Sequence, residues 1–437
     1  MSKTQLRKTL SAPGLLRLAR GRFERIEDPV AGRGLTLSDC LMSALAMFGL
    51  KYASLLSFER DVRGDERIRS NLRSLYGVGR APSDTAMRER LDRVDPSELR
   101  GAFKAVLSAL QRGKGLDGFA WHDGHYLLSV DGTGHFSSKT VHCDNCCVKE
   151  HKDGTRTYYH QMLGAAIVHP DLREVFALPP EPIMRSDGDT KNDCERNAAK
   201  RLLRDVRREH PHLKLMVVED GLASNGPHVR LLRELDMRFV LGAKPGDHAD
   251  LFETAAASPM TRTMEAKGAD GTRHRCRFIN GVPLNDANRD LEVNFLEWTE
   301  TKPDGKARRF SWVTDVAVDE TNAESLMRAG RARWRIENET FNTLKNQGYG
   351  FEHNYGHGKR HLATAFAMLA MLAFLIDQVQ QRCCALFRAA RKRAGRTKYL
   401  WERLRGLFLE LLVPDWETLY RAIAFGHRTE LVPFDTS

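Results

Sequence analysis

The chain has 437 residues, of which 41% are hydrophobic and 29% charged, so it is long enough for two or three domains and is not mostly disordered. Its 68 Lys and Arg residues outnumber its 57 Asp and Glu residues, and the resulting net charge of +11 favours a polyanionic partner, with nucleic acid as the first candidate. Eight cysteines are too few for a disulfide scaffold, which predicts mostly reduced thiols in a cytoplasmic protein.

Residues 1–118 predict a helical N-terminal domain. Asp39–Phe58 is apolar and long enough for one helix. A second short helix, a break rich in Gly and Pro, and a capped basic helix at Ser83–Val94 follow. This order is typical of a helix-turn-helix that binds DNA, here through Arg88 and Arg90. An ordinary helical hairpin with a solvated basic face is the alternative.

Residues 119–245 have the pattern of a mixed α/β (α+β) sheet with helices packed on it. The order of elements is β-β-β-α-β-α-β, in which helices connect some of the strands and the first strands follow one another directly. The expected elements are the strands Tyr126–Val130, Tyr158–Val168 and Arg173–Leu178, the helix Lys191–His210, the strand Leu213–Val218, the helix Asn225–Leu235 and the strand Arg238–Gly242.

Residues 246–310 interrupt this pattern with strand-like segments and turn residues, which predicts a β-rich insertion. Residues 311–380 then complete the α/β domain with helices. Their apolar run Leu362–Ile376 is shorter than the roughly 20 residues that span a bilayer, so we expect a buried helix and no membrane span. Residues 381–437 form a basic helical tail, a second candidate surface for DNA.

Three carboxylates stand where a metal site would need them. Asp131 and Asp220 each follow an apolar strand and precede a glycine, and Glu337 lies in a helical segment. Carboxylates on neighbouring strands can hold two Mg²⁺ ions about 4 Å apart, which would activate an attacking water and stabilise the leaving oxygen of a phosphodiester. A single Asp after a strand often serves only the turn. The metal hypothesis therefore depends on the fact that two aspartates, Asp131 and Asp220, each follow an apolar strand and precede a glycine.

Several of these segments resemble the bacterial insertion-sequence transposases of the DDE class. Arg333–Glu337 (RWRIE), followed by Phe341 and Lys345, resembles their glutamate helix, whose signature is Y-x2-R-x3-E-x6-K. Val130–Thr133 (VDGT) resembles the strand of their first catalytic aspartate, and Val217–Gly221 (VVEDG) that of the second. The resemblance covers roughly residues 120–380, and the β-rich insertion falls where the family carries one.

The resemblance implies an RNase H-like domain in which Asp131, Asp220 and Glu337 are both the catalytic residues and the ligands of two Mg²⁺ ions, with Mn²⁺ as a substitute. It further implies cleavage and strand transfer on double-stranded DNA, at terminal inverted repeats and at a target, by a homodimer associated with the nucleoid. Arg333 and Lys345 would grip DNA phosphates near the scissile bond. Each could instead pair with a neighbouring carboxylate. A catalytically inactive DNA-binding regulator and a metal-dependent nuclease are the alternative functions.

The glutamate helix departs from the family pattern. Position 330 is Gly where the signature has Tyr, and seven residues rather than six separate Glu337 from Lys345. Glu339 offers a rival alignment, but at about 100° per residue Glu337 and Glu339 project about 200° apart and cannot both face the sheet. Glu337 shares a stripe with Trp334, Phe341 and Leu344, which we expect to pack on the sheet, so Glu337 is the predicted ligand.

A cysteine cluster is a second candidate site. Cys143 and Cys146 form a C-x2-C pair, with His151, His160 and Cys194 downstream. Such a pair suits half of a tetrahedral Zn²⁺ site, but no second half follows at the usual spacing. Buried thiols in a β-hairpin are the alternative, and the sequence leaves both open.

Overall fold

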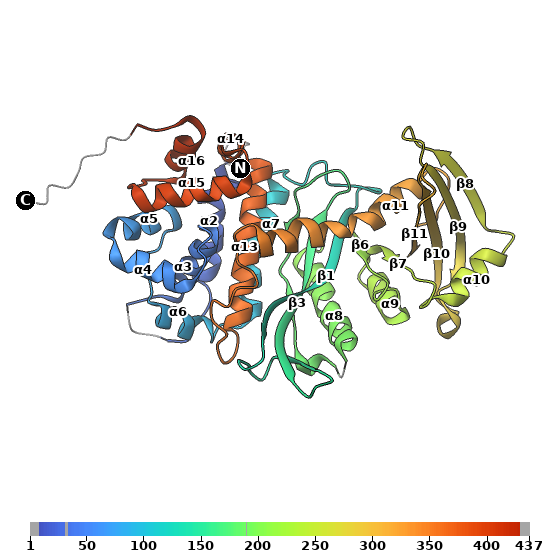
Figure 1. The fold of residues 1–437 in the computed structure, drawn as a ribbon, viewed down its shortest axis with the longest axis horizontal. Coiled ribbons are helices and arrows are strands. Elements are labelled where there is room, and N and C mark those ends of the chain that lie inside the picture. The colour runs from blue at the N-terminus through green and yellow to red at the C-terminus, as the bar shows by residue number, and fades with distance from the viewer. Residues whose placement is uncertain (1–7, 31–33, 189, 429–437) are drawn as a thin grey trace, which may run out of the picture. The chain divides into compact units, whose positions relative to one another are not determined.

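The computed structural model describes residues 8–30, 34–188 and 190–428 (Figure 1). The chain divides into two compact units. Leu116–Asn342 contains the strands and is called the sheet unit below. Met1–Gly115 and Thr343–Ser437 together form the helical unit. Thus the first and last of the segments expected from the sequence belong to one body.

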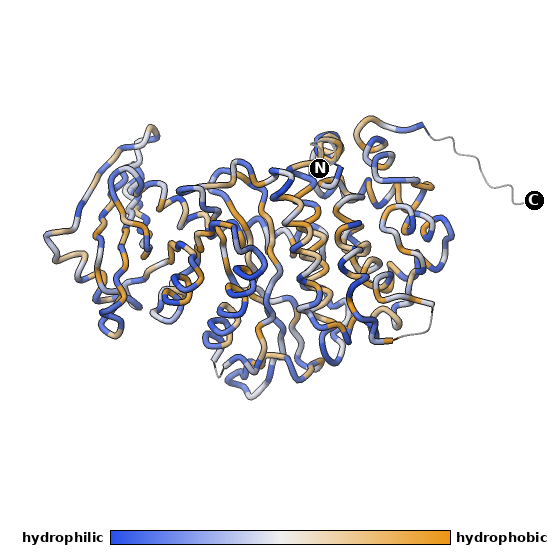
Figure 2. Tube along the Cα trace, turned by 180° about the vertical axis from the view of Figure 1, so that it is seen from behind, coloured by the Kyte–Doolittle hydropathy of each residue, from blue (hydrophilic) through white to orange (hydrophobic). Residues whose placement is uncertain are grey.

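The helical unit packs around one apolar helix, α13 (Leu362–Cys383), which lies against α3 and α7. Figure 2 shows hydrophobic residues concentrated on the packed helices of this unit. Among the described residues, α13 alone is long and apolar enough to cross a membrane, but 89% of its most apolar window is buried in the protein, as in the core helix of a globular domain. The other helices are α2 (Ala12–Phe23), α3 (Leu37–Gly49), α4 (Leu55–Gly64), α5 (Glu66–Tyr76), α6 (Asp84–Leu91), α7 (Pro96–Arg112), α14 (Ala385–Ala394), α15 (Thr397–Glu410) and α16 (Trp416–Phe425).

The single helix expected over Asp39–Phe58 is wrong. The chain forms α3 and α4 instead, separated by a turn in which Lys51 takes a left-handed backbone conformation with φ of 59°. The side chain of Ser54 then caps α4 by accepting a hydrogen bond from the backbone N–H of Ser57. The local capping chemistry of Ser54 thus overrides the continuous apolar pattern.

The sheet unit is built on a mixed sheet, which confirms the predicted fold class. β3 (Arg156–Val168) pairs antiparallel with β1 (Tyr126–Ser138), and β1, β6 (Leu215–Glu219) and β7 (Arg238–Gly242) are parallel neighbours. β4 (Phe176–Ala177) and β5 (Glu181–Ile183) also pair with β3. Antiparallel strands followed by two parallel crossovers form the sheet expected of an RNase H-like domain. The helices α8 (Lys191–Glu209), α9 (Gly226–Glu234) and α11 (Ala323–Ala332) accompany it (Figure 1).

The β-rich insertion continues the same sheet rather than folding apart from it. Its last strand, β11 (Ala307–Thr314), pairs antiparallel with β7, so the order runs β2-β3-β1-β6-β7-β11-β10-β9-β8. Buried apolar residues such as Leu241 and Val313 stand opposite each other at this junction. The remaining elements are β2 (Cys147–Glu150), β8 (Arg262–Lys267), β9 (Arg273–Pro283), β10 (Glu292–Thr301) and α10 (Ala249–Ala257).

Candidate active site

Asp131 and Asp220 come from neighbouring parallel strands. The ladder between β1 and β6 pairs Ser129 with Val218, and each aspartate lies two residues farther along its strand. Asp220 directly follows β6, as expected. Asp131 does not end its strand, because β1 continues to Ser138 and pairs Asp131 with Gly164 of β3. Both aspartates line one cavity of about 700 Å³.

Glu337 reaches the same strands from the helical segment η3 (Ile336–Phe341), which packs on β1 and β3. The Ser129 hydroxyl donates a hydrogen bond of 2.9 Å to the backbone oxygen of Arg333, which fixes the chain just before η3. At the other end of η3, Phe341 lies so close to Gly164 that a Cβ there would be 2.9 Å from the ring. A larger residue at position 164 would therefore push η3 away from the sheet.

Arg333 holds Asp131 and Glu337 together. Its Nη1 atom lies 3.2 Å from Asp131 Oδ2 and 3.2 Å from Glu337 Oε1, so these two oxygens are separated by at most twice that distance. Burial, a hydrogen bond with Glu337 and the charge of Glu337 raise the pKa of Asp131 to about 7, while the Arg333 guanidinium opposes the rise. Two carboxyl groups thus share a small space with one counter-ion.

Glu339 points elsewhere. Its carboxylate pairs with Arg335 at 3.2 Å, and Arg335 also donates a hydrogen bond of 2.6 Å to the backbone oxygen of Pro170, beyond the end of β3. The structure therefore brings Glu337, and not Glu339, to Asp131.

The stripe predicted for this helix is wrong in one position. Trp334, expected on the packed face, is 50% exposed and lies under the Arg333 guanidinium, 4.3 Å from the ring centroid. The buried positions of η3 are Ile336, Thr340 and Phe341. The prediction assumed α-helical geometry, whereas η3 is a π-helix with a wider turn.

The π-helix also gives the unusual spacing a local explanation. A π turn closes hydrogen bonds from residue i to i+5, so it takes up one residue more than an α turn. The sequence has one residue more than the family signature between Glu337 and Lys345, and η3 occupies Ile336–Phe341 within that interval. The extra residue therefore falls where the helix is widened, a geometry that is frequent at functional sites.

Asp220 is oriented by its own loop. Its Oδ1 atom accepts a hydrogen bond of 2.9 Å from the backbone N–H of Leu222. The preceding Glu219 is buried and lies 2.6 Å from His228 of α9. Asn225 caps α9 by accepting a hydrogen bond from the backbone N–H of His228. These contacts fix the backbone at the end of β6, and they thereby orient the Asp220 side chain toward the cavity.

Sequence reasoning missed Glu195, a further carboxylate that lines the cavity with Asp131 and Asp220. Glu195 lies on α8, and a Cβ added at Gly132 would be 2.8 Å from its Oε1 atom. Burial raises the pKa of Glu195, with the nearby charge of Lys191 opposing the rise and that of Asp220 adding to it. No motif spacing marks Glu195, but Gly132, directly after Asp131, indicates that something approaches the backbone closely.

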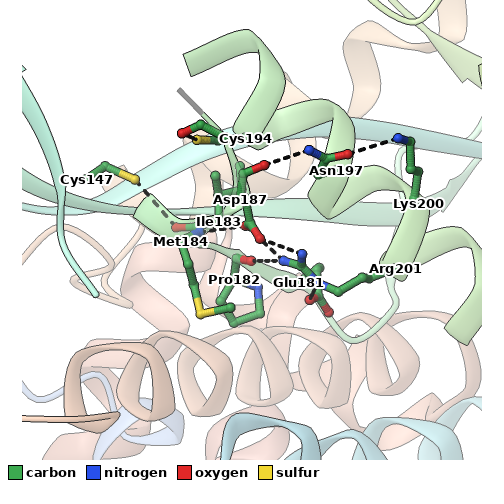
Figure 3. Close-up of polar contacts among 11 residues, drawn as sticks. Cys147, Glu181, Pro182, Ile183, Met184, Asp187, Cys194, Asn197, Lys200 and Arg201 are labelled. Carbon is green, nitrogen blue, oxygen red and sulfur yellow. Dashed lines mark hydrogen bonds and ion pairs between the residues drawn. The ribbon is translucent and has the colours of Figure 1, made fainter. Parts of the chain in front are cut away.

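An ion-pair network anchors α8 (Figure 3). Arg201 pairs with Glu181 of β5 at 2.6 Å and with Asp187 at 2.6 Å, and it donates a third hydrogen bond to the backbone oxygen of Pro182. Asn197 donates to the backbone oxygen of Asp187. These contacts hold α8, the helix that carries Glu195, against β5 and the segment that follows it. The anchoring residue Arg201 lies more than one helical turn after Glu195 in α8.

The four residues expected to contact DNA differ in their surroundings. Arg90 does not lie on an exposed face as expected, because its side chain is 4% exposed and pairs with Asp28. Arg88 is partly exposed and pairs with Asp84 of its own helix. Arg333 pairs with the two acids described above. The remaining candidate, Lys345, pairs with Glu352 at 2.7 Å.

The basic tail is more accessible. Between Arg382 and Arg405 the chain has nine basic residues, and six of these side chains are exposed. The exposed ones are Arg388, Lys392, Arg393, Arg396, Lys398 and Arg403. This surface keeps the predicted capacity to bind a phosphate backbone.

The donor set of the cavity fits a hard divalent cation. Carboxylate oxygens are the ligands that Mg²⁺ and Mn²⁺ prefer. Asp131, Asp220 and Glu195 line the cavity with such oxygens, and Glu337 lies next to Asp131 on the shared Arg333 guanidinium. Burial, and after it the hydrogen bond and the charge of Glu337, raise the pKa of Asp131, as expected of an acid that a cation would stabilise.

Comparison with known proteins points to one family. Residues 128–375, more than half of the chain, match the family model described as "Transposase DDE domain". No curated protein matches the sequence. Among solved structures, the piggyBac transposase synaptic complex with hairpin DNA, determined by cryo-EM, shares 10% identity with a TM-score of 0.42, over 100% of this chain and 87% of that chain. A likeness of this size carries no weight for function.

Proposed function

The chain belongs to the family of transposases with a DDE domain, and on that premise we propose that Asp131, Asp220 and Glu337 are its catalytic carboxylates. Cleavage and transfer of DNA strands are the general activity of that family. One observation supports this residue assignment above all others. Asp131 and Glu337 both pair with the guanidinium of Arg333, and β1, which carries Asp131, is the parallel neighbour of β6, which Asp220 follows. We further propose that the element is a bacterial insertion sequence.

The three carboxylates would hold Mg²⁺, or Mn²⁺ in its place, in two sites. Bound there, the ions would lower the pKa of an attacking water or 3′ hydroxyl and stabilise the departing oxygen of the phosphodiester. The protein's own part is to fix the acids on rigid elements. Asp131 is held on β1 by its pairing with Gly164 of β3, and the hydrogen bond between Ser129 and the backbone oxygen of Arg333 fixes the start of η3.

Arg333 is proposed to act as a counter-ion and then as a phosphate contact. It balances the charge of Asp131 and Glu337 in the structure. With Asp131 and Glu337 engaged in holding a cation, the Arg333 guanidinium would be available to bind the DNA backbone, which is the role that the family resemblance implies. Lys191, Arg196 and Lys244 also line the cavity and would attract the phosphates of the scissile strand.

The DNA partner is proposed to be double-stranded, with terminal inverted repeats at the element ends and a separate target, bound by a homodimer in the nucleoid. Support comes from the net charge of +11 and from the exposed arginines and lysines between Arg382 and Arg405. Binding through such side chains depends steeply on salt, because each phosphate contact releases counterions.

The test uses the DNA that flanks the reading frame. The full-length protein is incubated with a duplex that carries the candidate inverted repeat, in Mg²⁺, Mn²⁺ or EDTA, and the products are resolved on a denaturing gel. We expect nicks at the repeat boundary in either metal and none in EDTA, followed by joined products when target DNA is added. Nicks without joined products would favour the nuclease. Binding without nicks in any metal would favour the inactive regulator.

A further inference from the structure

A second cluster of metal-binding side chains lies in the sheet unit, apart from the carboxylates. Cys143 and Cys146 belong to the loop between β1 and β2, and His160 lies on β3. His160 stands opposite Phe136, close to the end of the β1–β3 ladder, whereas Asp131 is paired with Gly164 farther along it. We infer that Cys143, Cys146 and His160 bind a structural Zn²⁺ ion.

The distances match those of a tetrahedral zinc site. The Sγ atoms of Cys143 and Cys146 are 3.9 Å apart, and each lies 3.4 Å from His160 Nε2. With Zn–S of about 2.3 Å and Zn–N of about 2.0 Å at tetrahedral angles, the sulfurs should be roughly 3.8 Å apart and each sulfur roughly 3.5 Å from the nitrogen. All three observed separations agree within about 0.2 Å, the tolerance expected of a real site.

The backbone already has the turn that such a site needs. The N–H of Cys146 donates to the backbone oxygen of Cys143 at 3.2 Å, and the N–H of Cys143 donates to Cys146 Sγ at 3.5 Å. A backbone donor directed at sulfur stabilises a thiolate and orients it. The two thiols are therefore held in place before any ion binds, which lowers the entropic cost of binding.

The donor types select the metal. Two thiolates and one imidazole favour Zn²⁺ over the hard cations that suit carboxylates. Cys146 and His160 are buried, whereas Cys143 is partly exposed and borders a cavity of about 780 Å³ through which an ion can enter. A fourth donor, water or protein, would complete the usual four-coordinate shell.

Three other sulfur and imidazole groups of the sheet unit, those of Cys147, Cys194 and His151, are directed elsewhere. Cys147 Sγ donates to the backbone oxygen of Ile183, and Cys194 Sγ donates to that of Gly188. His151 Nε2 lies 2.8 Å from the hydroxyl of Thr157. Of the downstream residues that the sequence offered, His160 is thus the one that the fold brings to the C-x2-C pair.

The test measures metal in the purified full-length protein. After desalting, we expect about one Zn²⁺ per chain, and replacement by Co²⁺ should give the thiolate-to-cobalt charge-transfer bands of a tetrahedral site. Cys143→Ser, Cys146→Ser and His160→Gln should each weaken Zn²⁺ binding at least 100-fold. Cys147→Ser, a buried cysteine next to the cluster, is the matched control and should keep its zinc.

Two results would overturn the inference. One is wild-type protein, grown with added zinc, that retains less than a tenth of an equivalent and shows no thiolate band with Co²⁺. The other is retention of zinc by the Cys146→Ser or His160→Gln variant. Since the wild-type measurements do not depend on any variant folding, they decide the matter alone. None of these readouts involves DNA cleavage, so the outcome is independent of the proposed catalytic function.

Discussion

Two clusters of potential metal ligands lie along the β1–β3 ladder, one with Asp131 on β1 and the other with His160 on β3, and they differ in donor type, charge and burial. The acid cluster, Asp131 with Glu337, carries charged oxygen donors that are neutralised by Arg333. The thiol cluster, Cys143 and Cys146 with His160, has soft donors held in a backbone turn. One pair of strands therefore offers a site for an exchangeable ion and a site for a permanent one.

Access to solvent separates the two clusters further. The Glu337 side chain is 39% exposed and Asp131 borders an open cavity, so a DNA phosphate can reach the acid cluster. Cys146 and His160 are 1% and 6% exposed. With two of its three ligands buried and only Cys143 partly exposed, the thiol cluster suits a structural metal better than a catalytic one. The predictions below alter one cluster while leaving the other intact.

The largest effect is expected from the aspartates. Asp131→Asn and Asp220→Asn keep the side-chain shape but remove a ligand charge, so cleavage of end DNA should fall at least about 1,000-fold. Binding of the same DNA, measured by fluorescence anisotropy, should change less than about threefold. Cys143→Ser, which alters the other cluster, should leave a large part of the cleavage rate. If Asp131→Asn and Cys143→Ser lost the same fraction of the cleavage rate, the two clusters would not have the separate roles proposed for them.

Metal removal should act differently on the two clusters. After treatment with a strong chelator and dialysis, Mg²⁺ alone should restore occupancy of the acid cluster, and Zn²⁺ alone should restore the thermal stability lost at the thiol cluster. Differential scanning fluorimetry follows the melting temperature in each case. A melting temperature that Mg²⁺ restores as fully as Zn²⁺ would contradict the separation.

Asp131 should make the metal-free protein less stable at high pH. The pKa of Asp131 is about 7 in the fold, above its ordinary value of 3.8. Its stabilising contribution is then fully present below about pH 4 and is lost as the pH rises through 7. In EDTA, Asp131→Asn should therefore match the wild type at about pH 4 and exceed its free energy of unfolding by on the order of 4 kcal/mol at about pH 8.

Urea unfolding of both proteins across this pH range measures the difference. If the difference in free energy of unfolding between the wild type and Asp131→Asn stayed constant with pH, the pKa of Asp131 would not be raised in the folded protein. Addition of Mg²⁺ should close the gap at high pH, because the cation stabilises the ionised carboxylates of the wild type.

The smallest effect is expected from single basic residues of the tail. Arg393→Ala removes one exposed cation, so DNA binding should weaken severalfold and the slope of log affinity against log salt should fall by about 1. Arg90→Ala is the contrasting change. Because Arg90 is buried against Asp28, its loss should cost about 3 kcal/mol of stability and leave the salt slope unchanged. If the slope of log affinity against log salt fell in Arg90→Ala and not in Arg393→Ala, Arg90 rather than the tail would contact DNA.

Much of the sheet could be predicted from sequence, because its strands are apolar runs between strong turn signals. The strand expected at Arg238–Gly242 is β7 residue for residue, and the helix expected at Lys191–His210 is α8 with one residue less. Asp220 follows its strand as predicted. The fold class and the neighbouring positions of β1 and β6 could be predicted because alternating strands and helices have few ways to pack.

What could not be predicted depends on tertiary contacts. Arg90 looks like a surface cation in sequence, and only the distant Asp28 makes it a buried one. Glu195 belongs to no motif and reaches the cavity through the packing of α8 against Gly132. Trp334 was misplaced because a π turn cannot be recognised from helical periodicity. His160 lies on the far strand of the hairpin that follows Cys146, so its proximity appears only when β2 pairs with β3 and places Cys147 opposite Tyr159.

The most direct test of the account is a comparison of cleavage by Glu337→Gln and Glu339→Gln. Both changes remove one carboxylate charge from the same helix, and each carboxylate has one arginine partner four residues earlier. Since Glu337 lies beside Asp131 and Glu339 is held near Pro170, single-turnover cleavage of end DNA in Mg²⁺ should fall at least about 1,000-fold in Glu337→Gln and less than about threefold in Glu339→Gln. Cleavage that survives in Glu337→Gln and is lost in Glu339→Gln would contradict the assignment of the third carboxylate.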